Sequence, residues 1–223
     1  MLSKPGLILQ HETGGPPARF ADWLRDRGVE YELHAVWERP SLPDPREFEF
    51  VVSLGSERSA GETSGWVPVE IAMLREAIAA DVPVFGMCFG GQALAVALGG
   101  SVDVLDVPEI GWIAVETDDP TIPGGPWVHH HHDRIELPAG ADQIARTPVG
   151  PAAFRRGRHL GLQFHPEADA ELLEDWVRHD ARFAETGLTV DDVAEQGCEF
   201  SPGARELAYR LFDGWLASLT QGP

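Results

Sequence analysis

The residues best suited to covalent chemistry are one of the chain's two cysteines and the glycines around it. Cys88 stands in the stretch VPVFGMCFGGQALAVALGG, Val82 to Gly100, where a strand-like apolar run gives way to a helix-like run. Gly86 and Gly90 flank it in the spacing Gly-x-Cys-x-Gly, the sequence form of a strand–turn–helix nucleophile elbow. A helix N-terminus favours a thiolate. The pattern predicts an exposed nucleophilic sulfur, and the alternative is a buried structural cysteine in a tight turn.

A cysteine nucleophile needs a base, and the best candidate is His165 in the stretch GLQFHPEAD. His165 and Glu167 are two residues apart at the end of an apolar run, so on extended backbone their side chains point the same way. Glu167 would bond one imidazole nitrogen and fix the tautomer, which leaves the other nitrogen to take a proton from Cys88. The alternative interpretation is an ordinary surface turn.

Strand-like and helix-like segments alternate over the first hundred residues, and these elements must position the cysteine. Short apolar or alternating runs indicate strands, and amphipathic runs closed by glycine indicate helices. We expect strands at 6–10, 29–36, 48–55 and 82–87, and helices at 17–28, 67–80 and 89–98. This order predicts an α/β fold with a parallel sheet covered by helices on both faces.

The middle and the end of the chain have a different character. Strand-like runs at 101–107, 111–117, 127–137 and 152–165 are separated by loops rich in proline and glycine, and we expect them to form antiparallel hairpins added to the sheet. The segment 168–220 is expected to be helical in two or three pieces, the last of them capped by Ser201. One domain spanning residues 1–223 is the simplest account.

Charge and composition limit the class of protein. The chain has 17 basic and 36 acidic residues, a formal net charge of −19, which argues against a nucleic-acid partner. No apolar run is long enough to span a bilayer, and the N-terminal stretch MLSKPGLILQHE lacks the features of a signal peptide. We therefore expect a cytoplasmic protein with no membrane contact. Cys198 lies far from Cys88 and is expected to be packed at a helix end rather than in a disulfide.

Two motifs carry a family resemblance. The stretches GMCFGGQALA and GLQFHPEAD, in this order and separation, resemble the class I glutamine amidotransferases, whose glutaminases use a catalytic triad. The segments LILQHE, VVSLGS, PEIGW and HHDRIELPAGADQIART are also similar to the glutaminase domain of GMP synthase and its free-standing relatives, so the resemblance covers most of the chain. It implies the flavodoxin-like class I glutaminase fold: a three-layer, mostly parallel sheet with helices on both faces and added antiparallel hairpins.

The resemblance also implies roles for individual residues. Cys88 would attack a γ-carboxamide to form a γ-glutamyl thioester, with His165 as base and then acid and Glu167 orienting it. The oxyanion hole would use the Phe89 N–H and the Gly55–Ser56 turn, where this chain reads Gly-Ser-Glu in place of the Gly-Gly-Pro of many relatives. The matching positions for substrate binding are Gln92, His131, His132 and Asp133.

The run of four histidines, 129–132, has a second interpretation. Alternate histidines on extended backbone share a face, so two of them could chelate a metal. No carboxylate or cysteine completes a recognisable set with the usual spacing of a metal site. We favour a loop near the glutamine pocket or a solvated strand, and we expect neither a metal nor a cofactor.

These features favour a glutaminase-type amidotransferase that cleaves the γ-amide of glutamine through a cysteine thioester. The ammonia would be released or passed to a separate synthase subunit, because no phosphate-binding loop or ATP pyrophosphatase motif is present. One alternative is a γ-glutamyl hydrolase or peptidase that uses the same triad on γ-glutamyl amines or peptides. Another is a catalytically silent binding or regulatory protein, against which the intact Cys88, His165 and Glu167 argue.

Overall fold

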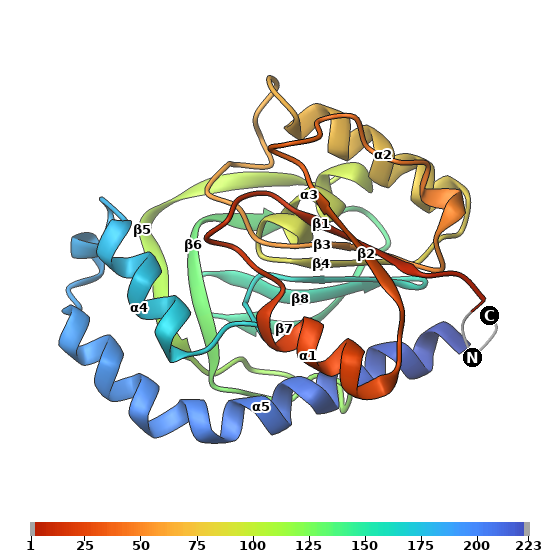
Figure 1. Ribbon diagram of the computed structural model, residues 1–223. Helices are drawn as coiled ribbons and strands as arrows, with labels where there is room; N and C mark the ends of the chain where they lie inside the picture. The colour runs from red at the N-terminus through yellow and green to blue at the C-terminus, as the bar shows by residue number, and fades with distance from the viewer. Residues whose placement is uncertain (1–2, 221–223) are drawn as a thin grey trace.

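A seven-stranded sheet forms the centre of the computed structural model, which describes residues 3–220 (Figure 1). The strands, in their order across the sheet, are β2 (Tyr31–Ala35), β1 (Gly6–Gln10), β3 (Val51–Ser53), β4 (Val84–Met87), β9 (His159–Leu162), β8 (Gly150–Arg156) and β7 (Asp142–Thr147). The first five are parallel, and β8 and β7 continue the sheet in antiparallel fashion. The expected α/β fold with a mostly parallel sheet is confirmed.

Helices cover both faces of this sheet. One face is covered by α1 (Ala18–Arg27) and α5 (Val190–Thr220), and the other by α2 (Val67–Ala79) and α3 (Phe89–Ala97). The helix α4 (Ala170–His179) packs against α5 and the strand Trp127–Glu136, and short 3-10 turns lie at Pro45–Glu47 and Phe183–Thr186. The seven elements expected in the first hundred residues are all present, with ends that shift by a few residues.

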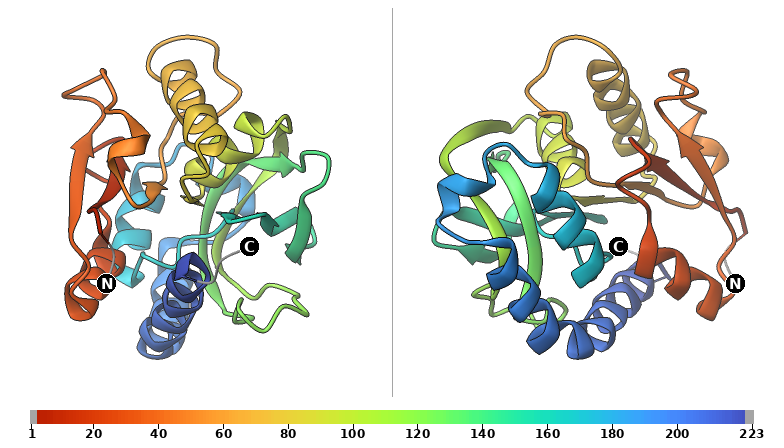
Figure 2. Two further views of the ribbon diagram at one scale, coloured as in Figure 1. Left: turned by 90° about the vertical axis from the view of Figure 1, so that its right-hand side faces the viewer. Right: turned by 60° about the vertical axis from the view of Figure 1, so that its left-hand side comes forward.

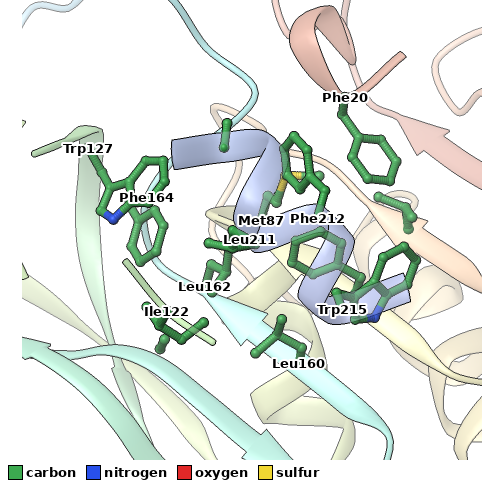
Figure 3. Close-up of a cluster of buried hydrophobic side chains, with 14 of the residues drawn as sticks. Phe20, Met87, Ile122, Trp127, Leu160, Leu162, Phe164, Leu211, Phe212 and Trp215 are labelled. Atoms are coloured by element: carbon green, nitrogen blue, oxygen red, sulfur yellow. The ribbon is translucent and has the colours of Figure 1, made fainter. Parts of the chain in front are cut away.

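Two hydrophobic cores follow from the alternation of strand side chains. On β1, Ile8 packs against α1 and α5, whereas Leu7 and Leu9 point to the opposite face and pack against α2 and α3. Figure 3 shows the first of these cores, where Phe212 and Trp215 of α5 pack among apolar side chains from the sheet. Strands with apolar side chains on both faces are typical of parallel sheets buried between helices.

A second, two-stranded sheet lies apart from the first. Strand β5 (Ser101–Ile113) pairs with β6 (Trp127–Glu136) in antiparallel fashion, with a register shift between Val104 and Glu109. The expectation that these segments extend the main sheet was wrong, because Ile110, Trp112 and Val128 bury their side chains against α4 and α5 instead. Figure 2 shows this ribbon, in yellow-green and green, beside the blue helices.

The C-terminal helix also differs from its prediction. α5 runs without interruption over 31 residues with Pro202 inside it, so Ser201 lies within the helix and does not cap it. Apolar residues on both sides of the proline, among them Val193 and Phe212, pack into the cores, and this burial outweighs the local helix-breaking signal. Cys198 is exposed on this helix, not packed. None of the described helices combines the length and apolarity needed to cross a bilayer.

Candidate active site

The sharp turn between β4 and α3 carries Cys88. Its backbone has φ 50° and ψ −110°, a conformation that L-residues rarely adopt and that marks a strained strand-to-helix turn. A Cβ on Gly86 would lie 2.2 Å from the carbonyl oxygen of Gly90, and one on Gly90 would lie 2.0 Å from that of Ser53. Only glycine therefore fits on either side of the cysteine.

The backbone around Cys88 leaves one donor free. The N–H of Cys88 bonds to Leu162 O at 2.9 Å, and the N–H of Gly90 bonds to Leu54 O at 3.0 Å. The N–H of Phe89, between them at the start of α3, has no acceptor among the described residues. A free N–H beside a cysteine nucleophile is the usual first half of an oxyanion hole.

His165 lies beside Cys88 and is held by Glu167. The Nδ1 atom of His165 is 2.7 Å from Glu167 Oε1, and both side chains are buried. With Nδ1 engaged, Nε2 is the nitrogen left to interact with Cys88, and no other nitrogen or oxygen atom among the described residues bonds to it. The structure thus brings together the three residues that the two sequence motifs predicted.

The charge state of His165 follows from these neighbours. Burial by itself lowers the pKa of this imidazole, but the negative charges of Cys88 as a thiolate and of Glu167 raise it by more. The pKa of His165 therefore lies well above its ordinary value of 6.5. The imidazolium form is the one that pairs with a thiolate and can later donate a proton.

A side chain that the sequence did not single out, Trp176, and the backbone carbonyl of His130 cover this pair. The Trp176 ring of α4 lies 4.7 Å from the His165 ring, between centroids, and its Nε1–H donates to Gly14 O at 2.8 Å. The backbone carbonyl of His130 lies 3.6 Å from Cys88 Sγ. Cys88 is consequently 4% exposed, so the expectation that the elbow presents an exposed sulfur was wrong. The cover comes from β6 and α4, which the local motif does not encode.

The loop after β3 passes close to the same pair. A Cβ on Gly55 would lie 2.7 Å from His165 Cε1, so this glycine abuts the imidazole. Glu12 accepts hydrogen bonds from the Glu57 N–H at 2.9 Å and from Ser56 Oγ at 3.2 Å. The Ser56 N–H has no acceptor among residues 3–220.

Gln92 and Asp133, both expected at the substrate site, lie against each other behind the elbow. The Gln92 amide Nε2 donates to Asp133 O at 3.3 Å and is 3.4 Å from Gln163 Oε1. The Asp133 carboxylate accepts a short hydrogen bond from Ser59 Oγ. Both residues are buried, and the polar groups named here bond within the protein.

The four histidines of β6 alternate between its two faces. On one face, His131 Nε2 is 2.9 Å from Glu109 Oε2 on β5, and His131 Nδ1 is 2.9 Å from Asp133 O. On the other face, His132 Nε2 is 2.7 Å from Asp180 Oδ2. Both ring nitrogens of His131 are therefore occupied by partners within the chain, and His132 points away from His131.

Glu109, His129 and His131 are the one set among the described residues with the spacing of metal ligands. His129 Nδ1 lies 3.1 Å from Glu109 Oε2 and 3.4 Å from His131 Nε2. The expectation that no carboxylate completes such a set was wrong, because strand pairing places Glu109 opposite His131. Contacts within the chain account for these atoms, so we assign no metal to them.

Burial and the contacts among these residues shift the pKa values of Glu109 and His129. Burial raises the pKa of Glu109, but contacts with His129 and His131 outweigh it and hold that pKa well below its usual range. Burial lowers the pKa of His129 to about 4, so this imidazole is neutral near pH 7. The cluster is therefore a buried carboxylate with hydrogen-bonding imidazoles that ties β5 to β6.

Comparison with known proteins identifies the family. A family model described as glutamine amidotransferase class-I matches residues 51–178, which include the elbow and both His165 and Glu167. This chain belongs to the class I glutamine amidotransferase family. The resemblance noted from the sequence is therefore confirmed.

Curated relatives of this class I glutamine amidotransferase are longer than it is. A glutamine-hydrolyzing GMP synthase of Aeropyrum pernix is 30% identical over 192 residues, covering 79% of this chain and 36% of that protein. One of Methylococcus capsulatus is 31% identical over 202 residues, covering 76% of this chain and 36% of that protein. The chain spans about a third of the length of these relatives.

Solved structures match nearly the whole fold. A glutamine amido transferase from Methylobacillus flagellatus has a TM-score of 0.82 at 24% identity, covering 99% of this chain and 97% of that one. A glutamine amidotransferase from Thermotoga maritima has a TM-score of 0.84 at 23% identity, covering 98% and 99% of the two chains. At these identities the likeness shows the shared fold.

Proposed function

We propose that this chain hydrolyses the γ-amide of glutamine through a γ-glutamyl thioester on Cys88. The observation that carries the proposal is the placement of Cys88 at a strained elbow beside His165, whose Nδ1 is 2.7 Å from Glu167 Oε1. Family membership supports an amidohydrolase, and the contacts of His165 with Cys88 and Glu167 support the proposed roles of nucleophile, base and orienting carboxylate.

The proposed first step is acylation. The Cys88 thiolate attacks the γ-carbonyl carbon, and the carbonyl π electrons move onto oxygen to form a tetrahedral oxyanion. When the oxyanion collapses, the C–N bond breaks and the nitrogen takes the His165 proton, so that ammonia leaves. His165 is then neutral and can act as a base.

The proposed second step is hydrolysis of the thioester. Neutral His165 removes a proton from a water molecule, and the hydroxide oxygen attacks the same carbon to form a second oxyanion. Collapse breaks the C–S bond and regenerates the Cys88 thiolate beside the His165 imidazolium, and the released γ-carboxylic acid loses its proton to solvent to give glutamate. Glu167 keeps the imidazole oriented in both steps.

The proposed oxyanion hole consists of the N–H groups of Phe89 and Ser56. Both lack an acceptor among the described residues, and both lie in segments that adjoin Cys88 or His165. Backbone donors need no particular side chain, so the Gly-Ser-Glu sequence of this turn is compatible with the role.

We propose that Gln92 and Asp133 form the wall behind Cys88 against which the substrate binds. His131 and His132 act indirectly, because their bonds to Glu109 and Asp180 fix the strand that brings the His130 carbonyl to Cys88 Sγ. The ammonia is either released or passed to a separate synthase partner.

The test measures turnover by the purified chain alone on glutamine and on a panel of γ-glutamyl amines, with ammonia or amine and glutamate quantified. We expect equimolar ammonia and glutamate from glutamine, complete loss in Cys88→Ser and no loss in the matched control Cys198→Ser. A kcat/KM at least tenfold higher for γ-glutamyl amines than for glutamine would instead identify a γ-glutamyl hydrolase. If neither glutamine nor any γ-glutamyl amine is turned over, the proposal that the chain is an enzyme is contradicted.

A further inference from the structure

A buried ion pair lies next to the loop that carries Ser56 and takes no part in the proposed proton transfers. His11 Nε2 is 2.8 Å from Glu70 Oε2 on α2, and both side chains are 0% exposed. The other oxygen of Glu70 accepts from Ser53 Oγ at 2.6 Å. On its second nitrogen, Nδ1, His11 is 3.0 Å from Gly55 O.

The imidazole of His11 is held in a single orientation. The Trp66 ring stacks on it at 4.7 Å between centroids with an interplanar angle of 12°, and the Phe89 ring meets it edge-on at 4.9 Å. Both nitrogens face acceptors, a carboxylate and a carbonyl, so both bonds exist together only when each nitrogen carries a hydrogen. Burial lowers the pKa of His11, but Glu70 and the Gly55 carbonyl raise it by more, which favours this imidazolium form.

The contact between His11 Nδ1 and Gly55 O fixes the orientation of the whole Gly55–Ser56 peptide unit. The C=O and the N–H of one trans peptide unit point in opposite directions, so a C=O directed at His11 sends the Ser56 N–H the other way. Glycine at position 55 would otherwise let this peptide rotate, because glycine reaches backbone conformations closed to other residues. His11 therefore restrains the carbonyl of this peptide, whereas Glu12 holds the Ser56 side chain and the Glu57 N–H that follow it.

We propose that His11 is a positioning residue that sets the Gly55–Ser56 peptide, and with it the Ser56 N–H, for oxyanion binding. The inference rests on the proposed function and deepens it. Glu70 and Ser53 hold the imidazole in place, so the oxyanion hole is formed in the isolated chain and needs no partner subunit to turn the peptide. The role is indirect, since His11 bonds to Gly55 O and not to the reacting atoms.

Two matched double variants separate this role from simple packing. His11→Leu with Glu70→Gln removes the donor to Gly55 O while leaving no unpaired buried charge. His11→Asn with Glu70→Gln restores an N–H donor near the position of Nδ1. His34→Leu serves as a control, because His34 is also buried and bonds one backbone carbonyl, Arg39 O at 2.7 Å, on neighbouring β2.

Three readouts are compared for each variant. They are kcat and KM for glutamine, the rate of Cys88 alkylation by iodoacetamide, and the inhibition constant of glutamate γ-semialdehyde. Alkylation tests thiolate reactivity without an oxyanion, whereas the aldehyde forms a hemithioacetal whose oxygen occupies the oxyanion hole.

The Leu variant is expected to lower kcat by roughly 10²–10³-fold and to raise the inhibition constant of the aldehyde in parallel. Its KM and alkylation rate stay within about threefold, as expected for loss of an interaction made only in the transition state.

The Asn variant and the His34→Leu control are expected to keep kcat within about tenfold of the wild type. The inference is overturned if the Leu variant retains wild-type kcat, or if its kcat and alkylation rate fall together. It is also overturned if the Asn variant loses as much kcat as the Leu variant. If the Leu variant does not fold, the Asn variant decides the question, because a loss of kcat beyond about tenfold relative to the wild type then overturns the inference. A wild type inactive on glutamine contradicts the proposed function instead, and the comparison is then made on γ-glutamyl p-nitroanilide. Inactivity on both substrates overturns both claims.

Discussion

The Nδ1 atom of His165 lies 2.7 Å from Glu167 Oε1, across a single intervening proline. His165 forms an isolated β-bridge with Val128, and Pro166 and Glu167 form the turn that follows it. The expectation that His165 and Glu167 align on extended backbone was therefore wrong, because the two side chains meet across a local turn. In the proposed mechanism this bond selects the tautomer that leaves Nε2 for Cys88, so Glu167 acts through His165 without touching the sulfur.

Glu167→Gln is expected to lower kcat by roughly 10²–10⁴-fold, because an amide can donate to Nδ1 and reverse the tautomer. Initial rates at saturating glutamine measure the effect, and thermal unfolding verifies that the variant is folded. Glu171→Gln, an exposed carboxylate in the first turn of α4, is the control and should change kcat by less than about twofold. Equal rates for Glu167→Gln and the wild type would remove Glu167 from the mechanism.

Gly55→Ala is expected to impair catalysis through a direct clash. The new Cβ would lie 2.7 Å from His165 Cε1, and the imidazole cannot simply move away because Glu167 and Cys88 fix it. We expect kcat to fall by at least roughly 100-fold, as for other displacements of about 1 Å in an active site. Gly14→Ala is the matched control, because a Cβ there meets nothing within 4 Å. A Gly55→Ala variant with wild-type kcat would show that the loop is not as close to His165 as described.

Glu109→Gln is expected to destabilise the fold by about 1–3 kcal/mol, since it removes the charge that the two buried imidazoles contact. Urea unfolding measures the free energy. Asp103→Asn is the control on the same strand, because its ion pair with Arg134 is exposed and contributes little. Dialysis of the wild type against a chelator should leave its unfolding midpoint unchanged. A midpoint that drops on chelation and recovers with zinc would show that Glu109, His129 and His131 hold a metal.

The pair of His11 and Glu70 predicts a specific pH dependence of stability. The folded-state pKa of His11 is raised above its unfolded value of about 6.5, so the protonated imidazole contributes stability that is fully present below pH 6.5. This contribution is lost as the pH rises through the folded pKa. Urea unfolding of the wild type and of the variant carrying His11→Asn and Glu70→Gln should therefore give a stability difference that shrinks above pH 6.5. A difference that grows with pH would contradict the assigned charge state.

The first half of the fold could be predicted because local periodicity decided it. Strands such as β1 and β4 are short apolar runs, and turn glycines at 86 and 90 marked where a helix begins. The pairing of β5 with β6 could not be predicted, because it depends on contacts with α4 and α5 that are distant in the sequence. The same nonlocal pairing brings Glu109 to the histidines and the His130 carbonyl to the cysteine.

The positions of the polar residues in the site were predictable only in part. His165 and Glu167 are two residues apart, so their pairing could be predicted from spacing, although they meet across a turn and not on extended backbone. Glu70 carried a usable signal, because it interrupts the buried face that Val67, Ile71 and Leu74 form on α2 at helical spacing. A buried carboxylate of this kind requires a hydrogen-bond or ion-pair partner, but no local sequence pattern identified His11 as that partner.

The central claim is acylation of Cys88, and the most direct test is to trap the acyl-enzyme. The purified chain is mixed with glutamine, quenched in acid during turnover and digested, and the cysteine peptides are analysed by mass spectrometry. The mechanism predicts a γ-glutamyl group on the peptide containing Cys88, accumulating when hydrolysis limits the rate and absent in Cys88→Ser. Ammonia release with the label only on Cys198, or with activity surviving in Cys88→Ser, would contradict it.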